Sequence, residues 1–184
     1  MDITIGGMME ADIPSLRAIQ NDNLRTTLPP DQMQDGYLSI AFSEDEFRAF
    51  NRDLCVVVAR VDGEVAGYCC VSSAAFNADF PILDRIMANL PAYKVPGESQ
   101  PPAEATSCIY GPACIARPFR GRGILDLMFS RAAMLAEEAG YLFCFSFVSA
   151  GNARSLQAHL KLPFQEVGRI SHNGNAYIVI ACRL

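Results

Sequence analysis

The sequence predicts a single α/β (α+β) domain over residues 1–184, built on a mixed, mostly antiparallel sheet of about seven strands flanked by helices. Apolar runs on both sides of an Asp-Gly pair at 62–63 and of a His-Asn-Gly triplet at 172–174 are typical of antiparallel β-hairpins. A strand, a long helix and a second strand over residues 106–149 predict one βαβ unit with a parallel strand pair.

The first elements are indicated by apolar spacing and by capping residues. A short strand over residues 2–6 precedes residues 9–24, whose apolar side chains recur at helical spacing. Prolines, a glycine and polar residues make residues 25–39 a predicted loop. A second helix is expected to open at Ser43, because Glu46 follows at the spacing of a capping box.

The middle of the chain is predicted to be a hairpin, a short helix and an excursion. Two β-branched runs, residues 54–61 and 64–73, flank the Asp-Gly turn. Residues 81–90 are expected to form a short helix. Residues 91–102 contain four prolines and are predicted to be an exposed excursion, after which residues 106–116 form the next strand.

The remaining elements complete the sheet. Residues 121–140 carry apolar side chains at helical spacing and end in a glycine, which predicts a long helix. Residues 141–149 are an apolar aromatic run, typical of a buried strand. A shorter helix over residues 152–161 precedes a closing hairpin of residues 164–171 and 175–183.

Composition narrows the classes of partner. The net charge of -5 argues against a broad nucleic-acid surface, so no nucleic acid is expected. No apolar run approaches the ~20 residues of a membrane helix and the start resembles no secretory signal, so we expect no membrane contact and a cytoplasmic location. The 7 cysteines fit no zinc spacing and are expected to be reduced, buried hydrophobes, with no metal site. A homodimer is left open.

A glycine-rich turn between a strand and the long helix is the first chemical signal. It reads Arg120-Gly121-Arg122-Gly123. Glycines let the backbone approach a bulky anion, and the unpaired N–H groups of a helix start favour negative charge. The arginines would add charge-assisted contacts. Neither the P-loop pattern nor the dinucleotide fingerprint fits. The segment is therefore either a phosphate site of another kind or an ordinary strand-to-helix turn with surface arginines.

The turn resembles the cofactor loop of the GNAT superfamily of N-acetyltransferases, whose pattern is Arg/Gln-x-x-Gly-x-Gly/Ala. Arg120 and Gly123 match, and Leu125 stands where the family usually has glycine or alanine. A later segment is similar to the family's Asn-x-x-Ala-x-x-x-Tyr-x-Lys-x-Gly-Phe. It matches at Asn152, at the lysine of position 161 and at the phenylalanine of position 164, while His159 occupies the tyrosine slot and a proline the glycine slot.

The resemblance implies acetyl-CoA, or another acyl-CoA, as co-substrate and a parallel strand pair that splays at the cofactor site. It implies an N-acetyltransferase in which a primary amine attacks the thioester directly, with a small-molecule amine favoured over a protein acceptor. The residues that the resemblance assigns to the cofactor are Ala113, Cys114, Ile115, Arg120, Gly121, Arg122, Gly123, Ile124, Leu125 and Asn152.

Each candidate catalytic residue has two interpretations. His159 is either the general acid for the leaving thiolate or a helix-face residue that packs near the cofactor. Glu104 is a candidate base or a solvated charge at a strand entry, and Tyr110 a candidate base or a packing residue. Deprotonation through water needs neither. Cys114 is better explained as an inert buried thiol than as a nucleophile, since no activating base lies near it in sequence.

The acceptor is expected over the helix-loop-helix of residues 25–50, with residues 76–102 as a second wall. Tyr37, Phe42 and Phe47 are either lining residues or core aromatics. The competing hypothesis, from a different class, is an acyl-CoA-binding sensor or interaction domain that keeps this fold without catalysis.

Overall fold

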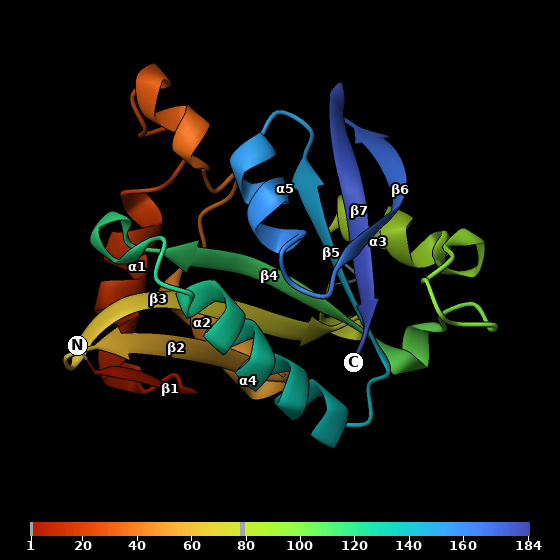
Figure 1. The fold of residues 1–184 in the computed structure, drawn as a ribbon, viewed down its shortest axis with the longest axis horizontal. Helices are drawn as coiled ribbons and strands as arrows, with labels where there is room; N and C mark the ends of the chain where they lie inside the picture. Colours follow the sequence, from red (N-terminus) through yellow and green to blue (C-terminus); the bar gives the residue numbers. More distant parts are fainter. Residues whose placement is uncertain (1, 78–79) are drawn as a thin grey trace.

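The computed structural model describes residues 2–77 and 80–184, and all seven strands of these residues join one sheet (Figure 1). The strands are β1 (Ile3–Gly7), β2 (Cys55–Val61), β3 (Glu64–Ser73), β4 (Ser107–Ile115), β5 (Phe143–Ser149), β6 (Gln165–His172) and β7 (Asn175–Arg183). The helices are α1 (Ile13–Asn21), α2 (Glu44–Asp53), α3 (Pro81–Ala88), α4 (Ile124–Glu138) and α5 (Ala153–His159). The spatial order β1-β2-β3-β4-β5-β7-β6 is antiparallel except for β4 and β5. This architecture confirms the predicted fold class.

Both predicted hairpins are present. Asp62 and Gly63 join β2 to β3 with φ of 50° and 86°, as a two-residue turn of the primed type requires. Asn173 and Gly174 join β6 to β7 in the same way, so the turn is one residue shorter than the predicted triplet and His172 is part of β6.

The parallel pair separates along its length. β4 has nine residues, yet only Ser107, Cys108 and Ile109 pair with β5. Just beyond them β4 carries one extra residue relative to β3, a bulge that includes the Gly111–Pro112 peptide. Bulges bend a strand, and in Figure 1 the arrowheads of β4 and β5 lie well apart. The predicted splay therefore begins at Tyr110.

Helices cover both faces of the sheet. Alternate residues of β2 face opposite sides, so Val57 packs under α4 while Val56 and Val58 pack under α1 and α2. A third apolar cluster, which includes Leu83 and Ile86 of α3, covers the β5–β7 part of the sheet. The helices of these layers do not cover the open end of the β4–β5 pair, which instead lies beside α5 and the loop before α2.

Several predicted boundaries shift. The helix expected over 9–24 is a 3-10 turn at Glu10–Asp12 followed by α1, and the helix expected over 121–140 begins only at Ile124. The prediction of an exposed excursion over 91–102 is only partly right, because Tyr93 and Val95 are buried in the third cluster. None of the described helices has the length and apolar character needed to cross a bilayer.

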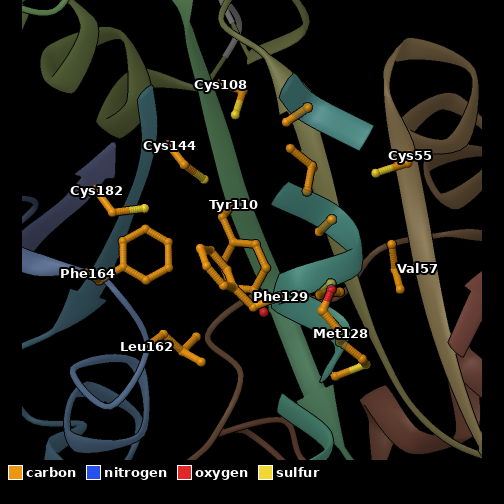
Figure 2. Close-up of a cluster of buried hydrophobic side chains, with 14 of the residues drawn as sticks. Cys55, Val57, Cys108, Tyr110, Met128, Phe129, Cys144, Leu162, Phe164 and Cys182 are labelled. Carbon is orange, nitrogen blue, oxygen red and sulfur yellow. The ribbon is translucent and has the colours of Figure 1, made fainter. Parts of the chain in front are cut away.

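All seven cysteines are buried free thiols, as predicted. Three of them lie side by side across β4, β5 and β7 beneath α4, among the aromatic rings of the core (Figure 2). Burial raises the pKa of Cys55 to about 11 and that of Cys114 to about 12, so these thiols stay protonated. They pack as small apolar side chains.

Candidate functional site

Two cavities meet where β4 and β5 separate. The first, of about 460 Å³, lies between the end of β4, the start of α4 and one side of α5, and we call it the cofactor-side cavity. The second, of about 370 Å³, lies between β5, α3 and the loop before α2, and we call it the acceptor-side cavity. Both are lined by Tyr37, Leu38, Ala113, Ser155 and His159. A reaction between two molecules, one in each cavity, would therefore take place at these residues.

The start of α4 supplies the polar floor of the cofactor-side cavity. Gly121 and Gly123 both have φ of 76°, and Gly123 is the N-cap of α4. The backbone N–H groups of the first turn, beginning at Ile124, have no partner within the helix, and the helix dipole adds partial positive charge there. Arg154 and Lys161 line the opposite wall of this cavity. The arrangement fits a ligand with several phosphate groups.

Arg120 lines the cofactor-side cavity, and its guanidinium also makes three hydrogen bonds within the protein. Its Nε donates to the Ile115 carbonyl at 3.0 Å, its Nη1 to the Asp35 carbonyl at 2.9 Å and its Nη2 to Asn23 Oδ1 at 2.6 Å. The guanidinium thus ties the end of β4 to the segment just after α1 and to the loop that carries Tyr37. It acts as a positioning residue for the wall shared by both cavities.

The other loop arginine also contacts the protein. Arg122 Nη2 donates to the Pro118 carbonyl at 3.0 Å, and its guanidinium lies 5.7 Å from the Phe119 ring centroid. These contacts hold the 3-10 turn at Arg117–Phe119 against the loop that follows it.

The backbone of β4 faces the gap at alternate residues. Ala116 N–H donates to the Ala66 carbonyl of the β3 side, and the register pairs Cys114 with Tyr68. In an antiparallel ladder the residues between such pairs point their N–H and C=O groups the other way, so those of Ala113 and Ile115 face the gap. Arg120 already occupies the Ile115 carbonyl. The N–H groups of Ala113 and Ile115 both face the gap, but only Ala113 lines both cavities, so its N–H is the donor best placed at their junction.

Cys114 lies with its backbone toward β3 and its side chain toward α1. Its Sγ is 4.0 Å from the Ile19 carbonyl oxygen, and it belongs to the cluster beneath α1 and α2. This placement, together with the raised pKa of the thiol, fits the inert role.

His159 lies at the junction of the two cavities with a defined tautomer. Its Nδ1 is 2.8 Å from the Ser155 carbonyl oxygen, and because a carbonyl only accepts, Nδ1 carries the proton. Burial lowers the pKa of the ring below its usual range, so the ring is neutral at pH 7 with a lone pair on Nε2. A neutral imidazole in this form accepts a proton before it can donate one.

Of the two base candidates, Tyr110 lines the acceptor-side cavity and Glu104 does not. Glu104 is exposed in a 3-10 turn before β4, at the opposite end of the strand from the gap, and it lines neither cavity. The ring of Tyr110 packs against those of Phe129 and Phe164 (Figure 2), and its centroid lies 5.9 Å from that of His159. The Tyr110 hydroxyl is buried beside the Cys69 thiol, and burial raises the pKa of the phenol well above its usual range. Tyr110 is therefore placed as a packing residue.

Asn152 is the N-cap of α5. Its Oδ1 accepts from Ser155 N–H at 3.4 Å, and its Nδ2 donates to the Tyr37 carbonyl at 2.9 Å. The side chain lines the acceptor-side cavity, whereas the prediction assigned it to the cofactor. Its amide joins α5 to the loop before α2.

The predicted acceptor region is partly right. Tyr37 and Phe42 line the acceptor-side cavity, whereas Phe47 is fully buried against Tyr68 beneath α2. The second wall comes from residues 77 and 80–83 rather than from the proline-rich stretch. The predicted wall also includes residues 78–79, which lie outside the described residues.

Four residues of the site were not predicted from the sequence. Asn23, Asp35, Ser155 and Phe147 each line a cavity or contact Arg120 or His159. Ser155 stands four residues before His159 on a predicted helix, so its carbonyl could have been identified from helical spacing. The other three depend on contacts between distant segments.

No protein-family model matches the chain, and no curated protein matches it in sequence. Solved structures do match. The N-acetyltransferase from Staphylococcus aureus Mu50 superimposes with a TM-score of 0.69 at 18% identity, over 100% of this chain and 99% of that chain. The ribosomal-protein-alanine N-acetyltransferase from Brucella melitensis gives 0.65 at 22% identity, over 98% of this chain and 99% of that one.

A third match carries a ligand. The PaiA N-acetyltransferase from Thermoplasma acidophilum, solved in complex with coenzyme A, gives a TM-score of 0.66 at 11% identity over 100% of both chains. Similarity at these identities is similarity of fold. The chain therefore has the GNAT fold that the two sequence blocks predict.

Proposed function

We propose that the protein is an acetyl-CoA-dependent N-acetyltransferase that acts on a small-molecule primary amine. The observation that carries the proposal is the meeting of the two cavities at His159 and Ala113, at the open end of the splayed strand pair. The cofactor-side cavity has the chemistry of a CoA site, with unpaired helix N–H groups at one end and two basic side chains on the facing wall.

The proposed mechanism uses two groups of the chain. Acetyl-CoA supplies an acetyl group on a thioester, and the amine nitrogen bonds to its carbonyl carbon as the carbon–sulfur bond breaks. Ala113 N–H donates to the carbonyl oxygen as negative charge develops there. His159 Nε2 accepts a proton from the amine and returns it to the departing sulfur, so the ring is both base and acid.

The proposal is tested by incubating the purified protein with acetyl-CoA and a panel of primary amines. The expected result is release of free CoA thiol together with an N-acetylated amine, identified by mass spectrometry. Acetyl-CoA binding without product from any amine would instead favour the non-catalytic acyl-CoA-binding domain.

Gly123 provides a prediction for the cofactor loop. Gly123→Ala places a side chain at φ of 76°, a conformation that costs a non-glycine residue about 1–2 kcal/mol. The loop relieves this strain only by leaving the geometry that aims its N–H groups, so acetyl-CoA affinity is expected to fall about tenfold, measured by calorimetry. Gly7→Ala is the matched control. Neither added methyl meets an atom within 4 Å, but Gly7 has no positive φ and lines neither cavity, so Gly7→Ala should leave acetyl-CoA affinity unchanged.

A further inference from the structure

Apolar side chains from three separate segments wall the acceptor-side cavity. Two phenylalanines come from α2 and the loop before it, one aromatic residue comes from β5, and the remaining three residues lie at the start of α3. They are Phe42, Phe50, Phe147, Phe80, Ile82 and Leu83. The rings of Phe42 and Phe50 meet edge to face with their centroids 5.2 Å apart. The Phe147 ring packs against that of Tyr177 with a centroid distance of 5.7 Å. Packing against neighbouring rings therefore holds the Phe42, Phe50 and Phe147 side chains in place.

The two ends of this cavity differ in chemistry. At one end, Ser155 and His159 are shared with the cofactor-side cavity and present polar atoms where transfer would occur. At the other end, Ile82 and Leu83 of α3 line the acceptor-side cavity alone. An acceptor with its amino group at His159 would therefore extend its remaining atoms toward apolar side chains.

The apolar walls also bear on the charge of the acceptor. Desolvation disfavours an ammonium ion, so it lowers the pKa of a bound amine and favours the neutral, nucleophilic form. A second ammonium group on the acceptor would enter the part walled by Ile82 and Leu83, where it would lose hydration, and no carboxylate is among the described residues that line the cavity. An acceptor with one amino group and a hydrocarbon body avoids this penalty.

The volume of the acceptor-side cavity limits the size of the acceptor's hydrocarbon part. At about 370 Å³ the cavity lies near the lower end of the roughly 300–1,000 Å³ of small-molecule sites. That volume suits one aromatic ring or a short branched chain attached to the amine.

From these observations we infer that the acceptor is a small hydrophobic monoamine, of the arylalkylamine or branched alkylamine class. The inference rests on the proposed function, because it names the substrate of the same site. It excludes polyamines and peptide N-termini as preferred acceptors, since both carry further polar or charged groups into the apolar end.

The test compares three amines at saturating acetyl-CoA: 2-phenylethylamine, 1,4-diaminobutane and an alanine-terminated peptide. We expect kcat/KM for 2-phenylethylamine to exceed that for either of the others by about 100-fold, the scale on which pockets discriminate by apolar contact and unpaired polar groups. Equal or better use of the diamine or the peptide would overturn the inference and leave the proposed function intact.

An engineered charge sharpens the test. Ile82→Glu places a carboxylate at the apolar end, in the first turn of α3, where the helix dipole favours negative charge. The preference for 2-phenylethylamine over 1,4-diaminobutane is expected to fall at least tenfold. Met134→Glu makes the same kind of change on the exposed face of α4, outside both cavities, and should preserve the preference. An unchanged preference in Ile82→Glu would contradict the inference.

The two proposals can fail separately. If no amine is acetylated, the proposed function fails, and binding of 2-phenylethylamine is then followed by NMR at alkaline pH in the unmodified protein and in Ile82→Glu. Binding that weakens in Ile82→Glu and not in Met134→Glu supports the inferred ligand class. Absence of binding to the unmodified protein overturns it.

Discussion

Replacing His159 with glutamine is expected to lower kcat by about 10²–10⁴-fold at saturating acetyl-CoA, the range that general acid–base catalysis contributes. Glutamine keeps most of the volume and a donor for the Ser155 carbonyl, but it cannot carry a proton between amine and sulfur. Acetyl-CoA affinity should change little, because the proposed phosphate contacts lie at the start of α4. An unchanged kcat would remove His159 from the mechanism and leave it as a packing residue beside Tyr110.

His159→Gln can also be tested by measuring how protein stability depends on pH. Burial lowers the pKa of His159 in the folded protein, so the unfolded chain binds a proton at this residue more readily. The neutral ring makes its full contribution to the free energy of unfolding above the ordinary histidine pKa of about 6.5. This contribution is lost as the pH falls through the lower pKa that His159 has in the folded protein. Denaturant unfolding at a series of pH values should show this loss in the unmodified protein and a smaller loss in His159→Gln. Equal pH dependence would contradict the burial of a neutral ring.

Replacing Phe164 with alanine is expected to lower the free energy of unfolding by about 3–5 kcal/mol, the usual cost of deleting a buried phenylalanine. The Phe164 side chain is 2% exposed, and its ring centroid lies 5.0 Å from that of Phe129 and 5.7 Å from that of Tyr110 (Figure 2). At about 2–4 °C per kcal/mol for a chain of this size, thermal unfolding should shift down by about 10 °C.

Phe164→Leu and Leu142→Ala are the comparison variants. Leucine keeps most of the buried apolar contact and should lose less stability than alanine at the same position. Leu142 is 40% exposed, so its truncation should change the free energy of unfolding by no more than about 0.5 kcal/mol. The His159 ring centroid lies 6.3 Å from that of Phe164, so Phe164→Leu is also expected to reduce kcat more than acetyl-CoA affinity. A loss in Phe164→Ala as small as that in Leu142→Ala would contradict the packing described for this cluster.

The parts of the fold that follow from short segments could be predicted from the sequence. Asp62-Gly63 allows positive φ between two β-branched runs, and Ser43 with Glu46 forms the capping box that the spacing indicates. The βαβ unit fixes the parallel pair, because a strand, a helix and a strand of these lengths have one common arrangement.

The role of Arg120 could not be predicted in this way. Its position in the glycine loop indicates a phosphate contact, yet its guanidinium bonds to Asp35 and Asn23, which lie 85 and 97 residues away in the chain. Those partners reach it only because α1 and the following loop fold over the end of β4. The sequence around Arg120 therefore does not predict its contacts with Asp35 and Asn23.

The residues that line the acceptor-side cavity could not be predicted from the sequence for the same reason. Phe42 and Phe47 are close in sequence and alike in composition, but only Phe42 faces the cavity, because Phe47 lies on the side of α2 that packs on Tyr68. Phe147 belongs to an aromatic strand, and its sequence does not indicate that this ring lines a cavity. The lining of the acceptor-side cavity therefore depends on tertiary packing, whereas the prediction of a phosphate site depends on a local motif.

The most direct test of an acetyl-CoA site at this location is native mass spectrometry of the purified protein titrated with acetyl-CoA. The expected result is a complex with one acetyl-CoA per chain that is depleted in Gly123→Ala and preserved in Gly7→Ala. No complex with the unmodified protein, together with no thermal stabilisation by acetyl-CoA, would contradict the account.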